Sequence, residues 1–261
     1  MKEETLRPVQ QRLAQAERMQ LFLDYDGTLA GFAPTPEHVD PDPEVVKLIT
    51  RLAKHPRFRV AVVSGRRLSH IRSLVPVPGI LLAGTYGIEL QTPEGEQINR
   101  MVFGDIRPAL DGLKPRWEHL IAGREGFFLE DKGWALALHA RFADEHEAER
   151  ILDAGHQMAR EAAGSGPYRL LGGHKFLEIG PSLANKGHTV EHLLEHYPWP
   201  GALPVYLGDD DKDEEAFGVI KARGGFAILV ASEHRKTEAD YRLESPQDAR
   251  RWLQTLPVRR R

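Results

Sequence analysis

The sequence repeats one pattern that restricts its fold more than any other: a short apolar run, a polar or acidic tip, and a segment with helical spacing. Three runs show the pattern most clearly, and these are Met19–Leu23, Phe58–Val63 and Val205–Leu207, which lead into Asp24, Ser64 and Gly208. Apolar runs of this length that stop at a turn signal are typical of buried strands. Each run is therefore predicted to be a strand that delivers polar side chains at its carboxyl end.

The segments between these runs have the apolar periodicity of helices. Residues 45–52 and 68–74 follow the first two tips, residues 185–196 precede the third run, and a further helix reaches Ala222 before the apolar run Phe226–Val230. Strands and helices that alternate in this way form right-handed crossovers and a parallel sheet. The prediction is an α/β fold with a doubly wound parallel, Rossmann-like sheet, which binds ligands beyond the carboxyl ends of its strands.

Residues from about 104 to 180 break this alternation. They show helical spacing over 106–120 and 144–163, and strand-like stretches at 127–129, 134–139 and 176–179. This order is typical of an α+β arrangement. We therefore expect a core made of residues 1–103 and 181–261 and a smaller α+β domain inserted at 104–180, with edges at Gly104 and Gly180.

Composition excludes several classes of protein. The 261 residues are 41% hydrophobic, which is enough for a sizeable core, and the net charge of -3 gives no global attraction to nucleic acid or to an anionic membrane. Because cysteine is absent, any metal must bind to oxygen or imidazole. Met1 to Gln20 lacks the apolar core of a secretory signal and no run reaches the ~18 apolar residues of a membrane span, so a cytoplasmic location is expected. The sequence carries no signature of oligomeric state.

The first tip, Asp24-Tyr25-Asp26-Gly27-Thr28, places two carboxylates two residues apart at a strand end. When the chain turns there, both can reach one site, where one carboxylate can attack a phosphorus atom while the other handles a proton. A carboxylate nucleophile divides hydrolysis into two easier steps through an aspartyl-phosphate. The alternative is a solvated turn, since Asp and Gly are common in turns.

A second acidic cluster, Gly208 through Glu214, follows the third apolar run directly. Two acidic strand ends at one edge of a sheet would repel without a cation, and oxygen ligands suit Mg²⁺. An EF-hand calcium loop that starts at Asp209 does not fit, because it would need Gly in place of Glu214 and Glu in place of Ile220. A solvated acidic loop remains the alternative.

Two further segments can hold a phosphate at the same edge. Ser64, Gly65 and Arg66 offer a hydroxyl, an open backbone amide and a helix start, and Lys186 opens a later helix with a positive charge. Taken alone, the first segment is better explained as a helix N-cap with a surface arginine, and a lone lysine means little. The order of all four segments along the chain is what favours one common site.

The four segments resemble the motifs of the haloacid dehalogenase superfamily, and the likeness covers nearly the whole chain. More narrowly, the chain is similar to trehalose-6-phosphate phosphatases. The residues that carry the narrower likeness are Leu23–Ala30, Val63–Arg66, Gly84–Glu89, Glu130–Gly133, His139, Arg141, Lys175–Glu178 and Gly208–Phe217.

The resemblance implies a role for each matched residue. Asp24 is the nucleophile and Asp26 the general acid and base, while Asp24, the main-chain carbonyl of Asp26 and Asp209 hold Mg²⁺ with support from Asp213. Ser64 and Lys186 bind the phosphate. The inserted domain becomes a cap whose side chains contact sugar hydroxyls, and these are Lys132, Arg141, Lys175 and Glu178, with His139 as a further candidate. An ordinary turn lysine at Lys132 and a solvated Glu178 are the alternatives.

The implied activity is the hydrolysis of a small sugar phosphate, trehalose 6-phosphate first among them. The alternatives are a phosphatase of glucosyl- or mannosyl-3-phosphoglycerate and a non-catalytic sugar-phosphate sensor, although a sensor would not need both Asp24 and Asp26. The chain departs from the family pattern at Tyr86, Ala140 and Lys212, where the family shows His, an aromatic residue and Thr. These departures concern the substrate more than the phosphatase chemistry.

Two other patterns match known motifs by chance. His192 and His196 have the spacing of an inverted zinc-protease motif, but their helix already follows Lys186 in the phosphatase arrangement. Residues 84–87 lack the third glycine and the helix start of a dinucleotide-binding loop.

Overall fold

The computed structural model describes residues 12–31 and 40–256, so part of the segment from Met1 to Gln20 lies outside the described residues. The chain divides into two compact units, one made of 1–98 and 185–261 and the other of 99–184. We refer to them as the core unit and the inserted unit. The glycines expected at the edges of the insertion lie inside regular elements, since Gly104 belongs to helix α4 (Phe103–Ile121) and Gly180 to strand β9 (Phe176–Pro181).

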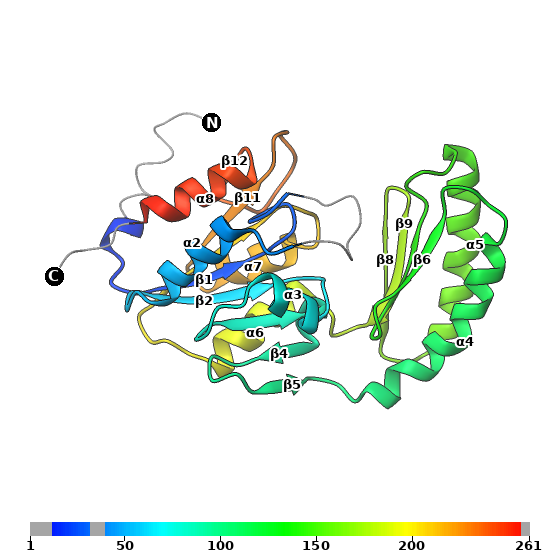
Figure 1. Cartoon of the computed structure of the whole chain (residues 1–261), viewed down its shortest axis with the longest axis horizontal. Helices are drawn as coiled ribbons and strands as arrows, with labels where there is room; N and C mark the ends of the chain where they lie inside the picture. Colours follow the sequence, from blue (N-terminus) through cyan, green and yellow to red (C-terminus); the bar gives the residue numbers. More distant parts are fainter. Residues whose placement is uncertain (1–11, 32–39, 257–261) are drawn as a thin grey trace. The chain divides into compact units, whose positions relative to one another are not determined.

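Eight strands of the described chain form one sheet that belongs to the core unit (Figure 1). Their order across the sheet is β12 (Tyr241–Leu243), β11 (Phe226–Val230), β10 (Leu203–Gly208), β1 (Met19–Leu23), β2 (Phe58–Val63), β3 (Leu81–Gly84), β4 (Glu89–Gln91) and β5 (Gln97–Asn99). The six strands from β12 to β3 are parallel, and β4 pairs antiparallel with β3. The doubly wound parallel sheet is thus confirmed, with an antiparallel extension at one edge.

The central strand β1 explains why the first acidic tip is buried. It pairs with β2 on one side and β10 on the other, with Met19 opposite Phe58 and Leu203. All five residues of β1 are buried, because helices cover both faces of the sheet. Tips that follow β1, β2 and β10 therefore meet at one edge.

Helices α2 (Pro43–Ala53), α3 (Leu68–Leu74) and α8 (Pro246–Thr255) pack on one face of the core sheet, in one apolar cluster with Leu21 and Leu23. Helices α6 (Lys186–His196) and α7 (Glu214–Ala222) pack on the other face, in a cluster with Phe22. The alternation of Leu21, Phe22 and Leu23 between the clusters is the two-residue period of a strand that is buried on both faces. None of the helices in the described ranges is long and apolar enough to cross a bilayer.

The inserted unit contains a four-stranded antiparallel sheet with two long helices on one face (Figure 1). The strand order is β6 (Phe128–Asp131), β7 (Leu136–His139), β9 and β8 (Tyr168–Gly173), and the helices are α4 and α5 (Glu145–Ala163). Trp117 of α4 is fully buried and its indole N–H donates to the carbonyl of Gly155 in α5, 3.0 Å away. This bond holds α4 and α5 together as one helical layer on one face of the sheet. The opposite face is formed by side chains of the strands.

Candidate active site

Asp24 lies directly after β1, at the carboxyl edge of the core sheet. Its backbone N–H donates to the carbonyl of Leu207 in β10, which holds the residue between two strand ends. Burial raises the pKa of the Asp24 carboxyl well above its usual range, while Lys186, with Nζ 2.9 Å from Oδ1, opposes the rise. A weakly solvated carboxylate beside a single ammonium group is suited to act as a nucleophile.

Asp209, at the end of β10, faces Asp24 across the hydroxyl of Thr28. The Thr28 Oγ1 atom lies 3.2 Å from Asp24 Oδ2 and 3.0 Å from Asp209 Oδ1, yet a hydroxyl has one proton and can donate to only one carboxylate. Burial raises the pKa of Asp209 to about 6. The Lys186 ammonium acts on both carboxylates, but one positive charge does not balance two negative ones, so a divalent cation bound by oxygen atoms fits between them.

The close approach of the two strand ends depends on Gly27. Its φ of +81° lies in the left-handed region, and a Cβ at this position would overlap the Asp209 carboxylate. Any other residue would therefore push apart the two acidic tips.

Asp213 supports this cluster from a fully buried position. One carboxylate oxygen of Asp213, one of Asp24 and one of Asp209 lie within 4.8 Å of one another. The donors to Asp213 are the Lys186 ammonium at 2.6 Å, the Tyr206 hydroxyl at 2.7 Å and the backbone N–H groups of Asp209 and Asp210, both at 3.0 Å. Each oxygen of Asp213 thus accepts two hydrogen bonds, which uses its lone pairs and leaves Asp24 and Asp209 as the carboxylates with free oxygen capacity.

Lys186 connects the nucleophile to this support. It is the first residue of α6, after the N-cap Asn185, and it is 3% exposed. Burial disfavours the charged ammonium, but Asp213 and Asp24 outweigh burial and raise the pKa of Lys186 well above its ordinary value. A permanent cation is therefore fixed next to the nucleophile.

Asp26 is held by a bidentate ion pair with Arg66. The distances are 2.6 Å from Arg66 Nε to Oδ2 and 2.6 Å from Arg66 NH2 to Oδ1. His70 lies 3.2 Å from NH1 on the other side of the guanidinium, and the backbone N–H of Arg66 donates to Ser64 Oγ at 3.1 Å. Ser64 and Arg66, expected at a phosphate site, thus lie in one network with Asp26, and Gly65 is the residue between them.

Two of the three departures from the family pattern contact each other in the core unit. Lys212 Nζ donates to the Tyr86 hydroxyl at 3.1 Å and lies 5.5 Å from the centre of the Tyr86 ring. Tyr86 and Thr85 both have positive φ angles, a strained backbone for residues with a Cβ. The Tyr86 ring covers Gly65, where a Cβ would overlap it, so this pair lies beside the predicted phosphate segment.

The open face of the inserted sheet carries three of the sugar-binding candidates. Lys132 Nζ lies 2.7 Å from Glu178 Oε2 and 3.8 Å from Glu130 Oε2, and His139 Nε2 lies 3.0 Å from Glu130 Oε2. Asp131, between Glu130 and Lys132 in sequence, instead pairs with Arg107 of α4, which lowers its pKa. The structure therefore brings Lys132, Glu178 and His139 together around Glu130.

The other two candidates lie outside this cluster. Lys175, in the turn between β8 and β9, donates to the carbonyl of Ala143 at 2.7 Å and lies 3.0 Å from Glu145. Arg141, in the loop after β7, is exposed. The expectation that all five residues contact a sugar stays a prediction.

Sequence reasoning missed Thr28, Tyr206 and Glu130 as contributors to these clusters. Thr28 and Glu130 were part of the quoted motifs, and Thr28 lies four residues after Asp24. Tyr206 lies within an apolar strand. A tyrosine buried there needs a hydrogen-bond partner for its hydroxyl, and this need is the one sequence signal for its contact with Asp213.

The histidines of the protease-like pattern do not form a metal centre with the acidic cluster. The His192 and His196 rings stack with centroids 3.9 Å apart, and His196 Nδ1 lies 3.0 Å from the carbonyl of His192. In the described ranges, the carboxylates that lie close enough together to bind one metal ion are those of Asp24, Asp209 and Asp213.

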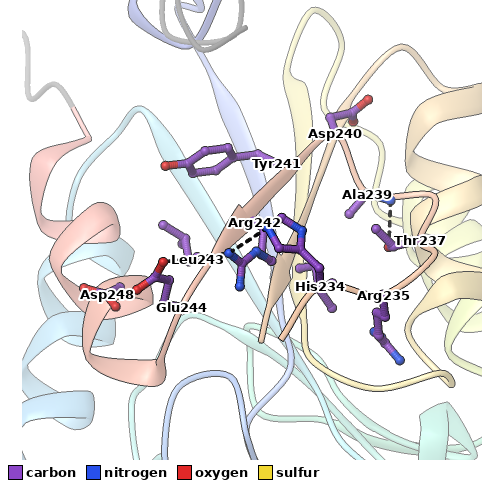
Figure 2. Close-up of a pocket in the computed structure, with 11 residues that line it drawn as sticks. His234, Arg235, Thr237, Ala239, Asp240, Tyr241, Arg242, Leu243, Glu244 and Asp248 are labelled. Carbon is purple, nitrogen blue, oxygen red and sulfur yellow. Dashed lines mark hydrogen bonds and ion pairs between the residues drawn. The ribbon is translucent and has the colours of Figure 1, made fainter. Parts of the chain in front are cut away.

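A cavity of about 450 Å³ lies elsewhere in the core unit, around β12 and the segment that precedes it (Figure 2). Arg235 on its wall pairs with Asp211 and Glu214, and Arg242 donates to the carbonyls of Ala231 and Ser232. Its arginines are thus engaged by the protein itself, and the cavity is not part of the acidic cluster.

The core unit has the fold of haloacid dehalogenase-like hydrolases. A solved structure described as a haloacid dehalogenase-like hydrolase from Bacteroides thetaiotaomicron covers 92% of this chain and all of its own, with a TM-score of 0.66 and 14% identity. The structure of Aspergillus fumigatus trehalose-6-phosphate phosphatase matches over 98% of this chain and 97% of its own, with a TM-score of 0.68 and 26% identity.

The sequence profile of the trehalose-phosphatase family matches residues 22–247, and the chain belongs to this family. Trehalose-phosphate phosphatase B of Arabidopsis thaliana is 30% identical over 256 residues, which span 93% of this chain and 67% of the relative. The residues matched by the family profile, 22–247, include both acidic strand ends and the whole inserted unit. The protein is therefore a phosphatase of the trehalose-phosphatase type, as the resemblance implied.

Proposed function

We propose that this protein hydrolyses trehalose 6-phosphate to trehalose and phosphate, through an aspartyl-phosphate at Asp24 and with Mg²⁺. The observation that carries the proposal is the buried Asp24 carboxylate, with a fixed ammonium group at 2.9 Å and a second carboxylate, Asp209, facing it across Thr28. A solvated turn or an acidic surface loop would not bury these groups together.

Asp24, Asp209 and the main-chain carbonyl of Asp26 are the proposed ligands of the metal ion. All are oxygen donors, which suits Mg²⁺, and Asp213 orients the cluster through its four donors without binding the ion directly. When bound, the ion neutralises charge on the nucleophile and on the phosphoryl oxygens.

In the first step, an oxygen of Asp24 attacks phosphorus while the bond from phosphorus to the sugar oxygen breaks, and Asp26 gives its proton to that oxygen. In the second step, water attacks the phosphorus of the aspartyl-phosphate, Asp26 takes a proton from the water, and Asp24 leaves as the free carboxylate. Lys186 and Ser64 hold the phosphoryl oxygens throughout.

The ion pair between Arg66 and Asp26 gives the free enzyme a resting state. A carboxylate with both oxygens on a guanidinium is not placed to protonate a leaving group. A phosphate dianion offers the same guanidinium another bidentate partner. Arg66 therefore moves to the phosphate when substrate binds, and this exchange releases Asp26 toward the sugar oxygen.

Steady-state phosphate release tests the proposal across trehalose 6-phosphate, sucrose 6-phosphate, glucose 6-phosphate and glucosyl- and mannosyl-3-phosphoglycerate. We expect the highest kcat/KM for trehalose 6-phosphate, at least roughly tenfold above glucose 6-phosphate, because a monosaccharide leaves polar groups of the protein unpaired. A preference for a phosphoglycerate would overturn the substrate. Acid quenching during turnover should trap one phosphoryl group on Asp24, and its absence would overturn the mechanism.

A further inference from the structure

Three aromatic side chains form a row across the sheet of the inserted unit. The pairing register places Phe128 of β6 opposite His139 of β7, and His139 opposite Phe176 of β9. The rings of Phe128 and His139 are parallel within 6°, with centroids 4.2 Å apart, and Phe176 is tilted by 58° at 5.3 Å from His139. Register and ring contacts agree that all three project from one face, and we refer to them as the aromatic row.

A polar row lies next to the aromatic row on the same face. The register places Glu130 opposite Ala137 and Ala137 opposite Glu178. Residues two apart on a strand project to the same side, so Glu130 follows Phe128 on this face. The methyl group of Ala137 leaves room between the two carboxylates, and the Lys132 ammonium lies within 4 Å of both. Donors and acceptors therefore border the aromatic rings.

Phe128 is the accessible member of the aromatic row. It lies on β6, the edge strand of its sheet, so His139 covers one face of its ring and no strand covers the other. The side chain is 40% exposed. The four large apolar side chains exposed in the described ranges all belong to the inserted unit, and Phe128 alone among them is held in a ring stack with the polar row beside it.

We propose that the aromatic row is the part of the sugar subsite that recognises a glucopyranose ring by its C–H face, with Phe128 as the stacking residue. A pyranose has an apolar face of C–H groups and a rim of hydroxyls, and it needs both a flat apolar surface and nearby hydrogen-bonding groups. The Phe128 ring supplies the first, and Glu130 on the same strand, with the Lys132 ammonium beside it, supplies the second. Stacking on His139 fixes the Phe128 ring before the sugar binds, which lowers the entropic cost of binding. This inference rests on the proposed function.

The test is Phe128→Ala, with Phe142→Ala as the matched control. Phe142 has the same side chain in the same unit and is 74% exposed, but it lies outside the aromatic row. We expect Phe128→Ala to lower kcat/KM for trehalose 6-phosphate about tenfold, mainly through KM, because an aromatic contact and its buried area are lost. Phe128→Trp should restore most of the loss and Phe128→Leu only part of it.

Acetyl phosphate, which has no ring to stack, separates this role from a structural one. Its turnover should change less than twofold in Phe128→Ala and in Phe142→Ala. Equal losses on acetyl phosphate and trehalose 6-phosphate, or equal effects of the two variants, would overturn the proposal.

A calorimetric titration of the whole chain with trehalose in Mg²⁺ tests the subsite without turnover. We expect Phe128→Ala to weaken binding about tenfold and Phe142→Ala to leave it unchanged. If the wild-type chain binds no trehalose at millimolar concentration, the aromatic row has no such role. If it binds trehalose but does not hydrolyse trehalose 6-phosphate, the proposed function fails and the subsite stands.

Discussion

The acidic edge of the core unit and the open face of the inserted unit use the same residue types in different surroundings. In the core, Asp24, Lys186 and Asp213 are buried together, and burial is the largest influence on each of their pKa values. In the inserted unit, Lys132 and Glu130 keep 16% and 19% of their side chains exposed beside aromatic rings, while their neighbour Glu178 keeps 3%. Burial shifts the pKa of the charged groups in the core, whereas Lys132 and Glu130 stay in part accessible to a ligand. In the proposed function, bond breaking takes place in the core and sugar selection in the insertion.

Asp24→Asn tests the first half of this comparison and should have the largest effect. It removes the nucleophile at almost constant side-chain volume, so turnover of every phosphate ester should fall at least roughly 10⁴-fold while the fold remains. Phosphate release from trehalose 6-phosphate and acetyl phosphate, together with circular dichroism, is the measurement. Near wild-type turnover of either ester would falsify the assignment of Asp24.

Chelation of divalent metal should affect the core in the same substrate-independent way. Turnover should stop and return with Mg²⁺, because Asp24 and Asp209 share one donor, Thr28, and the single ammonium group of Lys186 does not balance both carboxylates. Thermal unfolding gives a readout without turnover: Mg²⁺ at about 100 times its dissociation constant should stabilise the chain by roughly 2.7 kcal/mol. The Asp209→Asn variant is the control and should lose most of this stabilisation.

Asp26→Asn should reduce turnover by about 10²–10⁴-fold, the usual contribution of general acid and base catalysis. The loss should be smaller for acetyl phosphate, whose leaving group needs less help from a proton.

Arg67→Ala, next to Arg66 but exposed, serves as a charge control for Arg66→Ala. If Arg66→Ala and Arg67→Ala behaved alike, the ion pair with Asp26 would have no part in the reaction.

Glu178→Gln and Arg141→Ala test the second half of the comparison. Loss of a hydrogen bond to a sugar hydroxyl costs about 1–3 kcal/mol, so kcat/KM for trehalose 6-phosphate should fall roughly 5- to 150-fold in each variant. Acetyl phosphate cannot reach a sugar subsite, and its turnover should be unchanged. Equal losses on the two substrates would show that these side chains stabilise the fold, and would contradict the proposed role of the inserted unit in sugar recognition.

The smallest expected effect is the pH dependence of stability in the metal-free chain. The pKa of Asp209 is raised to about 6 in the folded protein, above its unfolded value near 4. The folded state therefore holds the proton more tightly, so this contribution to stability is fully present below pH 4 and is lost as the pH rises to 6. The loss should be on the order of 1–2 kcal/mol. Urea unfolding of the wild-type chain and Asp209→Asn at pH 4.5 and 7 checks this, and an equal pH slope in the two proteins would contradict it.

The sequence predicted the strands that carry the acidic tips because they are long, apolar and buried on both faces. Strand β12 has three residues and β8 ends in two glycines, so neither has enough periodic signal. The edge of the core sheet formed by β4 and β5 also consists of three-residue strands. Short elements of this kind are specified by their neighbours, which a local pattern does not contain.

The same limit applies to the candidate site. Motif spacing brought Asp24, Asp209 and Lys186 to one strand edge, because the direction of parallel strands fixes where their ends meet. The ion pair of Arg66 with Asp26 joins side chains 40 residues apart, and the aromatic row depends on the register of three strands. Such pairings follow from tertiary contacts, which residue spacing alone does not encode.

The position of β1 in the sheet also constrains how the chain folds while it is being synthesised. β1 leaves the ribosome before the inserted unit, and its neighbour β10 follows only after this whole unit, which is contiguous from 99 to 184. We expect the inserted unit to fold first, and a nascent chain stopped at residue 184 should show it as a protease-resistant fragment. Until β10 arrives, β1 has one free edge in the most apolar part of the protein, so the interval of greatest aggregation risk during biosynthesis is set by the length of the insertion.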